Sequence, residues 1–185
     1  MVADQNFSER DLSVVRWQLS SERIFMRGIA DRCGFGYPRV MWLDPQPEEA
    51  GGEANYEALS NLLWLTCPYL NERIHDLEQQ GLVDRIGGLI LEDSALLSKM
   101  NSAHAKFYYL RKGIFEKSFG CNIPEEMIRH LNTGIAGIRD IATLKCLHAH
   151  FCHYRICEDN LAGMITARLL GGRLDCQEAR CRHAY

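Results

Sequence analysis

Several features that define common protein classes are missing from this sequence. There is no run of basic residues and the net charge is −3, so electrostatics gives no reason to expect nucleic-acid binding. The N-terminus carries acidic residues but no apolar segment like that of a secretory signal, and no apolar run approaches the length of a membrane span. We therefore predict a cytoplasmic protein that binds neither nucleic acid nor membrane.

The eight cysteines also lack a familiar spacing, because no Cys-x2-Cys pair occurs among them. This absence argues against the usual zinc ribbon or zinc knuckle. A chain of 185 residues can bury a core without covalent crosslinks, and cytoplasmic thiols are mostly reduced. We therefore interpret the cysteines first as metal ligands or redox groups, and only second as disulfides.

The segment 139–160, RDIATLKCLHAHFCHYRICEDN, concentrates three cysteines and three histidines, and we predict that it forms one helix. At 3.6 residues per turn, one stripe of that helix carries Cys146, His150, His153 and Cys157. His148 and Cys152 would point to the other side. Since one stripe supplies about two ligands to a single ion, the remaining ligands must come from elsewhere in the chain.

Hydrophobic periodicity predicts an α+β fold that is mainly helical, with a small β-hairpin or sheet in the N-terminal third. The hairpin is predicted from 24–32 and 39–43, and a further buried strand from 61–66. Helices are predicted at 8–19, 69–80, 82–91, 94–117 and 161–170, and a short one begins at Pro124.

The same pattern indicates how the chain is divided. Proline, glycine and acidic residues predict a solvated loop at 44–56. We expect one domain over 1–185, with a core at about 8–172 and a polar tail at 173–185 that contains two cysteines and has no visible reason to fold alone.

Four cysteines outside the central segment have distinctive local settings. Cys33 lies in a glycine-rich turn, where backbone N–H groups can approach its sulfur. Cys67 precedes Pro68 at the start of a predicted helix, so the helix dipole should lower the pKa of its thiol. Cys176 and Cys181, in the tail, could close over a site formed elsewhere or form a redox pair.

Several motifs in combination resemble the bacterial domain-of-unknown-function family numbered 501. They are RWQL near the N-terminus, Cys33-Gly before a proline, WLTCP at 64–68, KCLHAH at 145–150, and Asp159-Asn160 with Gly163. The likeness spans nearly the whole chain and implies a small cytoplasmic bacterial protein without an assigned activity. The motif residues that it carries over are Cys33, Cys67, Cys146, His148, His153, Cys176 and Cys181.

The sequence also departs from the family pattern. Leu161 stands where the pattern has proline, and Cys152 and Cys157 look like additions peculiar to this member. Cys121 sits in a Gly-Cys-Asn turn and is interpreted as a bystander thiol, while His104 is interpreted as a hydrogen-bonded residue of the core or its boundary.

Three functions are compatible with these residues. The one we favour is an iron–sulfur protein with redox or sulfur-handling chemistry. Its candidate metal ligands are Cys33, Cys67, Cys146, His148, His150, His153, Cys176 and Cys181. The second is a zinc-stabilised protein that binds a partner without catalysis. The third is a thiol enzyme with Cys146 or Cys67 as nucleophile and His148 or His150 as base. In a fourth interpretation, the cysteines pack in the core as small apolar residues.

Overall fold

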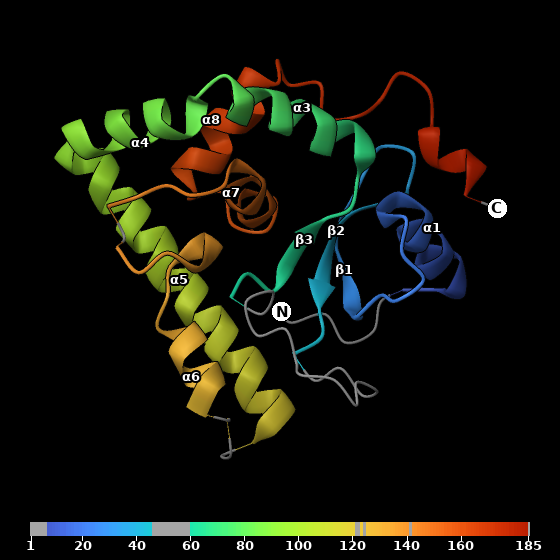
Figure 1. Cartoon of the computed structure of the whole chain (residues 1–185), viewed down its shortest axis with the longest axis horizontal. Helices are drawn as coiled ribbons and strands as arrows, with labels where there is room; N and C mark the ends of the chain where they lie inside the picture. The colour runs from blue at the N-terminus through green and yellow to red at the C-terminus, as the bar shows by residue number, and fades with distance from the viewer. Residues whose placement is uncertain (1–6, 46–59, 121–122, 124, 141, 185) are drawn as a thin grey trace.

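The computed structural model describes residues 7–45, 60–120, 123, 125–140 and 142–184, and it confirms the α+β fold in which helices dominate (Figure 1). Its sheet has three antiparallel strands in the order β1 (Met26–Arg32), β2 (Pro38–Leu43) and β3 (Leu63–Leu65). The predicted hairpin and third strand are therefore confirmed. Most of the predicted loop at 44–56 lies outside the described residues, as do Cys121 and Pro124.

Every residue of β2 is buried, because the sheet is covered on both faces. Successive side chains of a strand point to opposite faces, and the two sets enter different apolar clusters. Val40 and Trp42 belong to the main core, whereas Met41 and Leu43 pack in a smaller cluster beneath α1 (Glu9–Leu19). The sheet therefore joins α1 to the helical part of the molecule.

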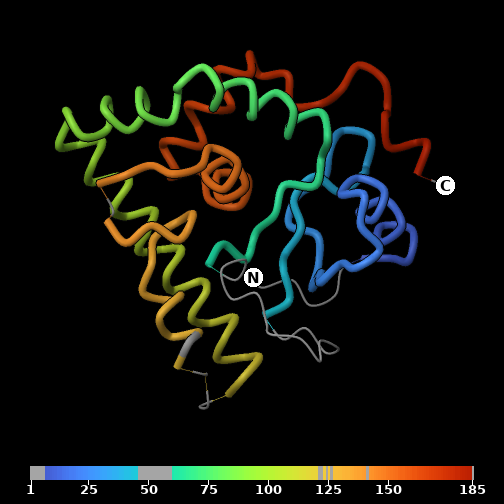
Figure 2. The backbone as a smooth tube through the Cα atoms, viewed as in Figure 1, coloured from blue at the N-terminus to red at the C-terminus, as the bar shows by residue number. Residues whose placement is uncertain are grey.

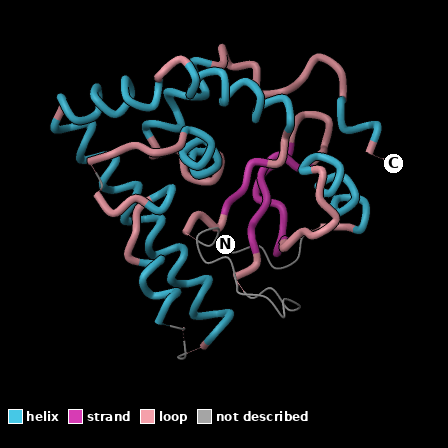
Figure 3. Tube along the Cα trace, in the orientation of Figure 1, coloured by secondary structure: helices cyan, strands magenta, loops and turns pink. Residues whose placement is uncertain are grey.

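The helical part surrounds one short helix. It consists of α3 (Pro68–Gln79), α4 (Leu82–Glu92), α5 (Ser94–Phe119), α6 (Glu125–Leu131), α7 (Leu147–Tyr154) and α8 (Leu161–Leu169), with 3-10 turns η1 (Ile135–Gly137) and η2 (Arg180–His183). Figure 1 shows α7 end-on near the middle. Figure 3 shows it with most of the other helices above and to its left and with the strands to its right. It contacts α8, β3 and α3. Its large apolar side chains, Leu147 and Phe151, are fully buried.

The prediction of one helix over 139–160 is wrong, because among the residues described in this segment only Leu147–Tyr154 is helical. Cys146 is the N-cap and has an extended backbone, with φ −152° and ψ 119°. Asp140 holds a turn before it by accepting a hydrogen bond from the backbone N–H of Ala142. The predicted stripe of four ligands therefore does not form, since Cys146 and Cys157 both lie outside the helix.

The polar sequence of the tail offers no reason to expect that it is ordered. In the structure, however, the tail packs against the rest of the molecule. The Asp175 carboxylate accepts a hydrogen bond of 3.0 Å from the backbone N–H of Gly34 and pairs with Arg39 at 2.8 Å. Further along, Arg180 pairs with Glu72 at 2.8 Å. The red end of the tube in Figure 2 follows this path from α8 past α3 to α1. None of the helices described here combines the length and apolarity that a membrane span requires.

Candidate metal centre

The candidate site forms where the N-terminus of α7 meets the last turn of α3. Cys146 is the N-cap of α7 and His148 lies in its first turn, while Glu78 comes from α3. The Glu78 carboxylate accepts a hydrogen bond of 2.6 Å from the backbone N–H of Leu147. Because the first N–H groups of a helix have no partner within it, this carboxylate caps α7 and is fixed beside Cys146 and His148.

The three side chains turn their ligand atoms toward one another. Nδ1 of His148 lies 3.2 Å from Oε1 of Glu78 and 3.9 Å from Sγ of Cys146. All three ligand atoms lie within 4.8 Å of one another. Ligands bound to one tetrahedral zinc ion at its usual bond lengths are separated by about 3.3–3.8 Å, so small side-chain movements would bring this trio to that geometry.

The other ring nitrogen of His148 is also held. Nε2 donates a hydrogen bond of 3.2 Å to the backbone carbonyl of Asn71, which can only accept. A neutral His148 ring therefore has its lone pair on Nδ1, facing the carboxylate of Glu78. Two electron-rich atoms so close require either a cation between them or a proton on Nδ1. A carbonyl behind the non-binding nitrogen is the usual arrangement of a metal-bound histidine.

Two cavities meet at Cys146. One, of about 500 Å³, is lined by Trp64, Asn71, His148 and Cys152 among others. The other, of about 360 Å³, is lined by the cations Arg129, Arg139 and Lys145, and no acidic residue lines it among those the structure describes. The site is therefore reachable from solvent, and one approach carries positive charge.

The electrostatics of Cys146 do not match those of a thiol nucleophile. Burial raises the pKa of the Cys146 thiol, and the nearby Glu78 carboxylate raises it further, which outweighs its hydrogen bonds from the backbone N–H groups at the start of α7. Its neighbour Cys152 is fully buried, and burial raises the pKa of that thiol well above its usual range. Of the two histidines predicted as a base for Cys146, His148 faces its sulfur, whereas His150 is buried in the core.

His150 and His153 belong to the core instead. The side-chain amide nitrogen of Asn160 lies 3.1 Å from Nδ1 of each ring, and its two N–H groups donate to both. In each neutral ring the remaining nitrogen then carries the proton. His104, as predicted, is a buried hydrogen-bonded residue, since its Nδ1 accepts from the backbone N–H of Ile135 at 3.1 Å. We leave His150 and His153 out of the candidate site.

The other four candidate ligands lie elsewhere. Cys33 follows β1, Cys67 is the N-cap of α3, and Cys176 and Cys181 are in the tail. Cys67 and Glu78 lie at opposite ends of α3, a separation of about 16 Å along the helix axis. The predicted ligands therefore do not form one site. Cys146 and His148 lie beside Glu78, His150 and His153 lie in the core, and the other four cysteines lie elsewhere.

The expectation that the pKa of Cys67 falls is wrong. The pKa of its thiol is raised to about 11, chiefly by burial, and the neighbouring thiols of Cys181 and Cys33 act in the same direction. The hydrogen bond that Cys67 receives at the helix start and the positive charge of Arg39 act in the other direction but are weaker.

Sequence reasoning missed Glu78 and Asn160. Glu78 lies in a helix with many polar residues, and nothing in its spacing separates it from its solvated neighbours. Asn160 precedes Leu161 at the start of a predicted helix, and the residue type at that position indicates an N-cap, which the structure confirms. Its second role, as donor to two histidines, had no sequence signal.

Comparison with known proteins gives one match. A family model described as "Protein of unknown function (DUF501)" covers residues 29–168. It includes Glu78, Cys146 and His148 together with Cys33 and Cys67. The likeness is shorter than the motifs suggested, because the tail cysteines lie beyond it. No curated protein and no solved structure matches the chain.

Proposed function

Because this chain belongs to the DUF501 family, whose function is unknown, we propose a function from the geometry of its own side chains. We propose that it binds one divalent transition-metal ion, zinc in the first place, through Glu78, Cys146 and His148. The three residues supply a carboxylate oxygen, a thiolate sulfur and an imidazole nitrogen, all of which are common zinc ligands. The two negative charges of the thiolate and the carboxylate balance the charge of the ion.

The observation that carries this proposal is the orientation of His148. Its Nε2 donates to the carbonyl of Asn71, and its Nδ1 points at Glu78 and Cys146. An ion among these three atoms would remove the repulsion between a neutral ring and the carboxylate. It would also offset the burial that disfavours the Cys146 thiolate, because a coordinated thiol is deprotonated. The alternative is a protonated His148 that forms an ion pair with Glu78.

A site with three protein ligands keeps a fourth position for water or a substrate, as catalytic zinc sites do. The basic cavity beside Cys146 suggests that this ligand is a small anion. Arg129, Arg139 and Lys145 line that cavity, and they would attract a phosphate, sulfate or carboxylate group. We therefore propose metal-assisted chemistry on an anionic small molecule.

The other functions predicted from the sequence fit this site less well. Among the residues described at this site, Cys146 is the only partly exposed thiol, so an iron–sulfur cluster held by several thiolates does not fit here. A thiol enzyme needs a thiolate, whereas burial holds Cys146 in its protonated form when no cation is bound.

The test is metal binding by the full chain after removal of metal with a chelator. Titration with Zn²⁺, followed by calorimetry, should detect a site that His148→Ala and Cys146→Ser each weaken at least tenfold. With Co²⁺ as the probe, Cys146→Ser should also abolish the thiolate-to-metal absorption band of this site. Matched controls are His75→Ala, an exposed histidine on α3, and Cys157→Ser, which lies outside the site.

Unchanged zinc binding in both site variants would contradict the proposal. If, in addition, Glu78→Gln destabilised the metal-free protein as much as His148→Ala does, Glu78 and His148 would form an ion pair that stabilises the fold. Circular dichroism of every variant separates lost binding from lost structure.

The anionic ligand is tested separately with inorganic phosphate and the zinc-loaded protein. Arg139→Ala and Lys145→Ala should each weaken phosphate binding several-fold, while Arg168→Ala, an exposed arginine on α8, should not. Equal phosphate binding in all three variants would show that the cavity does not select anions.

A further inference from the structure

Four cysteines that are far apart in the sequence gather at the N-terminal end of α3. The first link joins Cys33 to Cys176. Asp175 accepts a hydrogen bond from the backbone N–H of Gly34 at 3.0 Å. Cys33 precedes Gly34 and Cys176 follows Asp175, so this contact brings the two cysteines into the same region. The same carboxylate pairs with Arg39 at 2.8 Å, which holds this part of the tail on the sheet.

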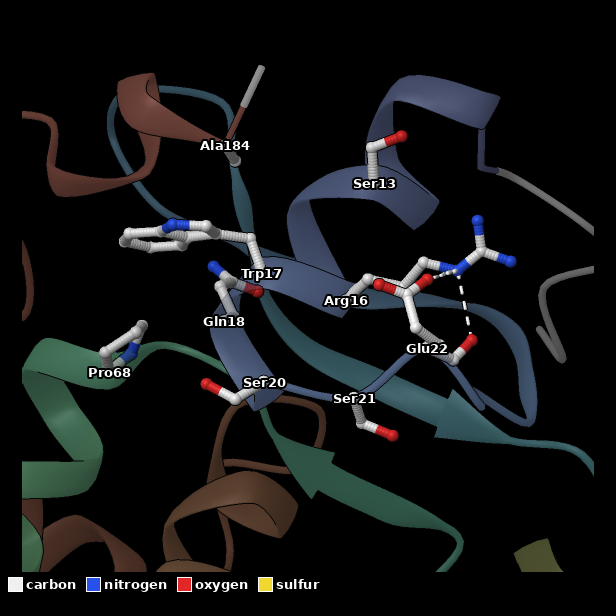
Figure 4. Close-up of a pocket in the computed structure, with 9 residues that line it drawn as sticks. All are labelled: Ser13, Arg16, Trp17, Gln18, Ser20, Ser21, Glu22, Pro68 and Ala184. Carbon is white, nitrogen blue, oxygen red and sulfur yellow. Dashed lines mark hydrogen bonds and ion pairs between the residues drawn. The ribbon is translucent and has the colours of Figure 1, made fainter.

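The second link joins Cys181 to Cys67. The side-chain nitrogen of Gln18 donates to Sγ of Cys181 at 3.2 Å and lies 2.8 Å from the carbonyl oxygen of Pro38. The next residue, Arg39, accepts a hydrogen bond of 3.4 Å from the backbone N–H of Cys67 through its carbonyl. Figure 4 shows the neighbouring pocket, with Trp17 and Gln18 of α1 between Pro68 and Ala184. The four thiols are close enough to affect one another's pKa. Cys181 and Cys33 raise the pKa of Cys67, and Cys33 and Cys176 raise the pKa of Cys181.

We propose that Cys33, Cys67, Cys176 and Cys181 bind an iron–sulfur cluster, at a centre distinct from that of Glu78, Cys146 and His148. All four cysteines are free thiols, two of them buried and two partly exposed. Four thiolates are the usual ligand set of such clusters.

The spacing of the sulfur atoms favours a cluster over a single ion. Four sulfurs around one zinc ion are about 3.8 Å apart, given a zinc–sulfur bond of about 2.3 Å. Among the described residues, the three ligand atoms that lie within 4.8 Å of one another are those of Glu78, Cys146 and His148. No three sulfur atoms of these four cysteines lie as close together as that. A cluster with several iron atoms holds its cysteine sulfurs farther apart than a single ion does.

The surroundings also suit a negatively charged centre. Arg39 is a buried cation beside Cys67, and its charge favours the thiolate form there. Asp31 and Asp175 pair with this guanidinium from two sides, so its position is fixed. Gln18 adds an N–H donor to the sulfur of Cys181, and such hydrogen bonds tune the reduction potential of clusters. A surface cavity of about 740 Å³, lined in part by Gln18, Pro68 and Ala184, lies over this region and would give a redox partner access (Figure 4).

The test measures iron, acid-labile sulfide and visible absorption in the full chain, purified without oxygen and reconstituted with iron and sulfide. The wild type should carry a cluster, and Cys176→Ser and Cys181→Ser should each lower its content at least tenfold. Because these two residues lie in the tail, their loss leaves the main core intact. Cys146→Ser and Cys157→Ser should keep the cluster, which separates this centre from the zinc site proposed above.

Three results would overturn the proposal. The first is a reconstituted wild type without iron and sulfide. The second is zinc without sulfide that is lost in Cys176→Ser, which would assign a single ion to the four thiols. The third is a cluster that survives in both tail variants. Loss of the cluster in Cys146→Ser as well would contradict the assignment of the cluster to a centre distinct from the zinc site.

Discussion

Gly163 lies directly against the backbone carbonyl oxygen of His150, where α8 crosses α7. A Cβ atom built on Gly163 would overlap this oxygen and would lie 2.5 Å from Cβ of Tyr154. The two helices can approach so closely only because this position has no side chain. The packing holds α7, and with it His148, in place.

Replacing Gly163 by alanine should therefore destabilise the fold. We expect Gly163→Ala to lower the free energy of unfolding by about 3 kcal/mol or more, because backbone and not a flexible side chain must move. Gly88→Ala is the matched control, since Gly88 also lies within a helix but a Cβ there meets nothing within 4 Å. It should be neutral or stabilising by up to about 1 kcal/mol. Urea denaturation compares the two variants, and equal stabilities would contradict this account of the crossing.

The buried histidines should make stability depend on pH. Burial lowers the pKa of His104 and of His153 to about 4 and that of His150 to about 3, and the charge of Arg111 also lowers the pKa of His104 and His153. Unfolded histidines take up protons near pH 6.5, whereas these three do so only near pH 3 to 4. The unfolded state therefore binds more protons, and stability falls as the pH is lowered from 6.5 to 4.

The size of this effect can be bounded. Each histidine contributes up to about 1.4 kcal/mol per pH unit, so three give a slope of up to about 4.2. Urea denaturation between pH 4.5 and 7 measures the slope. His104→Gln, which keeps an acceptor for the N–H of Ile135, should reduce it by about a third. A slope that does not change in this variant would show that His104 titrates normally.

Arg111 should be needed for the loop that precedes α7. Its guanidinium is fully buried and donates to the carbonyl oxygens of Ser60, His130, Leu131 and Thr133, with the ring of Phe107 4.7 Å away. Arg111→Met should cost on the order of 4 kcal/mol, since these carbonyls lose their donor. Arg111→Lys should recover only part of the loss, because one ammonium group cannot span them all. Arg168→Met, on the surface, should change stability by less than about 0.5 kcal/mol.

Docking of the tail should depend on Asp175 even without metal. Asp175→Ala removes both the acceptor for Gly34 and the ion pair with Arg39. In chelator-treated protein we expect a protease to cleave the tail of this variant at least several-fold faster than that of the wild type. Glu178→Ala, which breaks an exposed pair within the tail, serves as the comparison. Cleavage at the same rate in both would show that Asp175 does not hold the tail.

The features predictable from sequence were those set by neighbouring residues. The hairpin around Cys33 follows from a glycine-rich turn between two segments with β-branched residues. α1 begins directly after Ser8 because Ser8 and Asp11 form a capping box. The position of Cys67 at a helix start follows from Pro68. In each case the cause lies within a few residues.

The features that could not be predicted depend on distant contacts. Cys146 and His148 are two positions apart and would diverge on a helix, but they meet because Cys146 is extended. Asp175 finds Gly34 across 141 positions of the chain, and no local pattern in the tail indicates that contact. Burial at Cys67 depends on what packs around it, which is why the dipole alone gave the wrong direction for its pKa.

The cap on α7 has a consequence for the order of folding. The first N–H of this helix is satisfied by Glu78, which lies 69 positions earlier. A helix of eight residues is too short to be stable alone, and its own sequence supplies no side-chain cap. A peptide of residues 139–160 should therefore be unstructured in water. In the intact chain α7 should form late, after α3 has docked, so its contacts should be absent from the folding transition state.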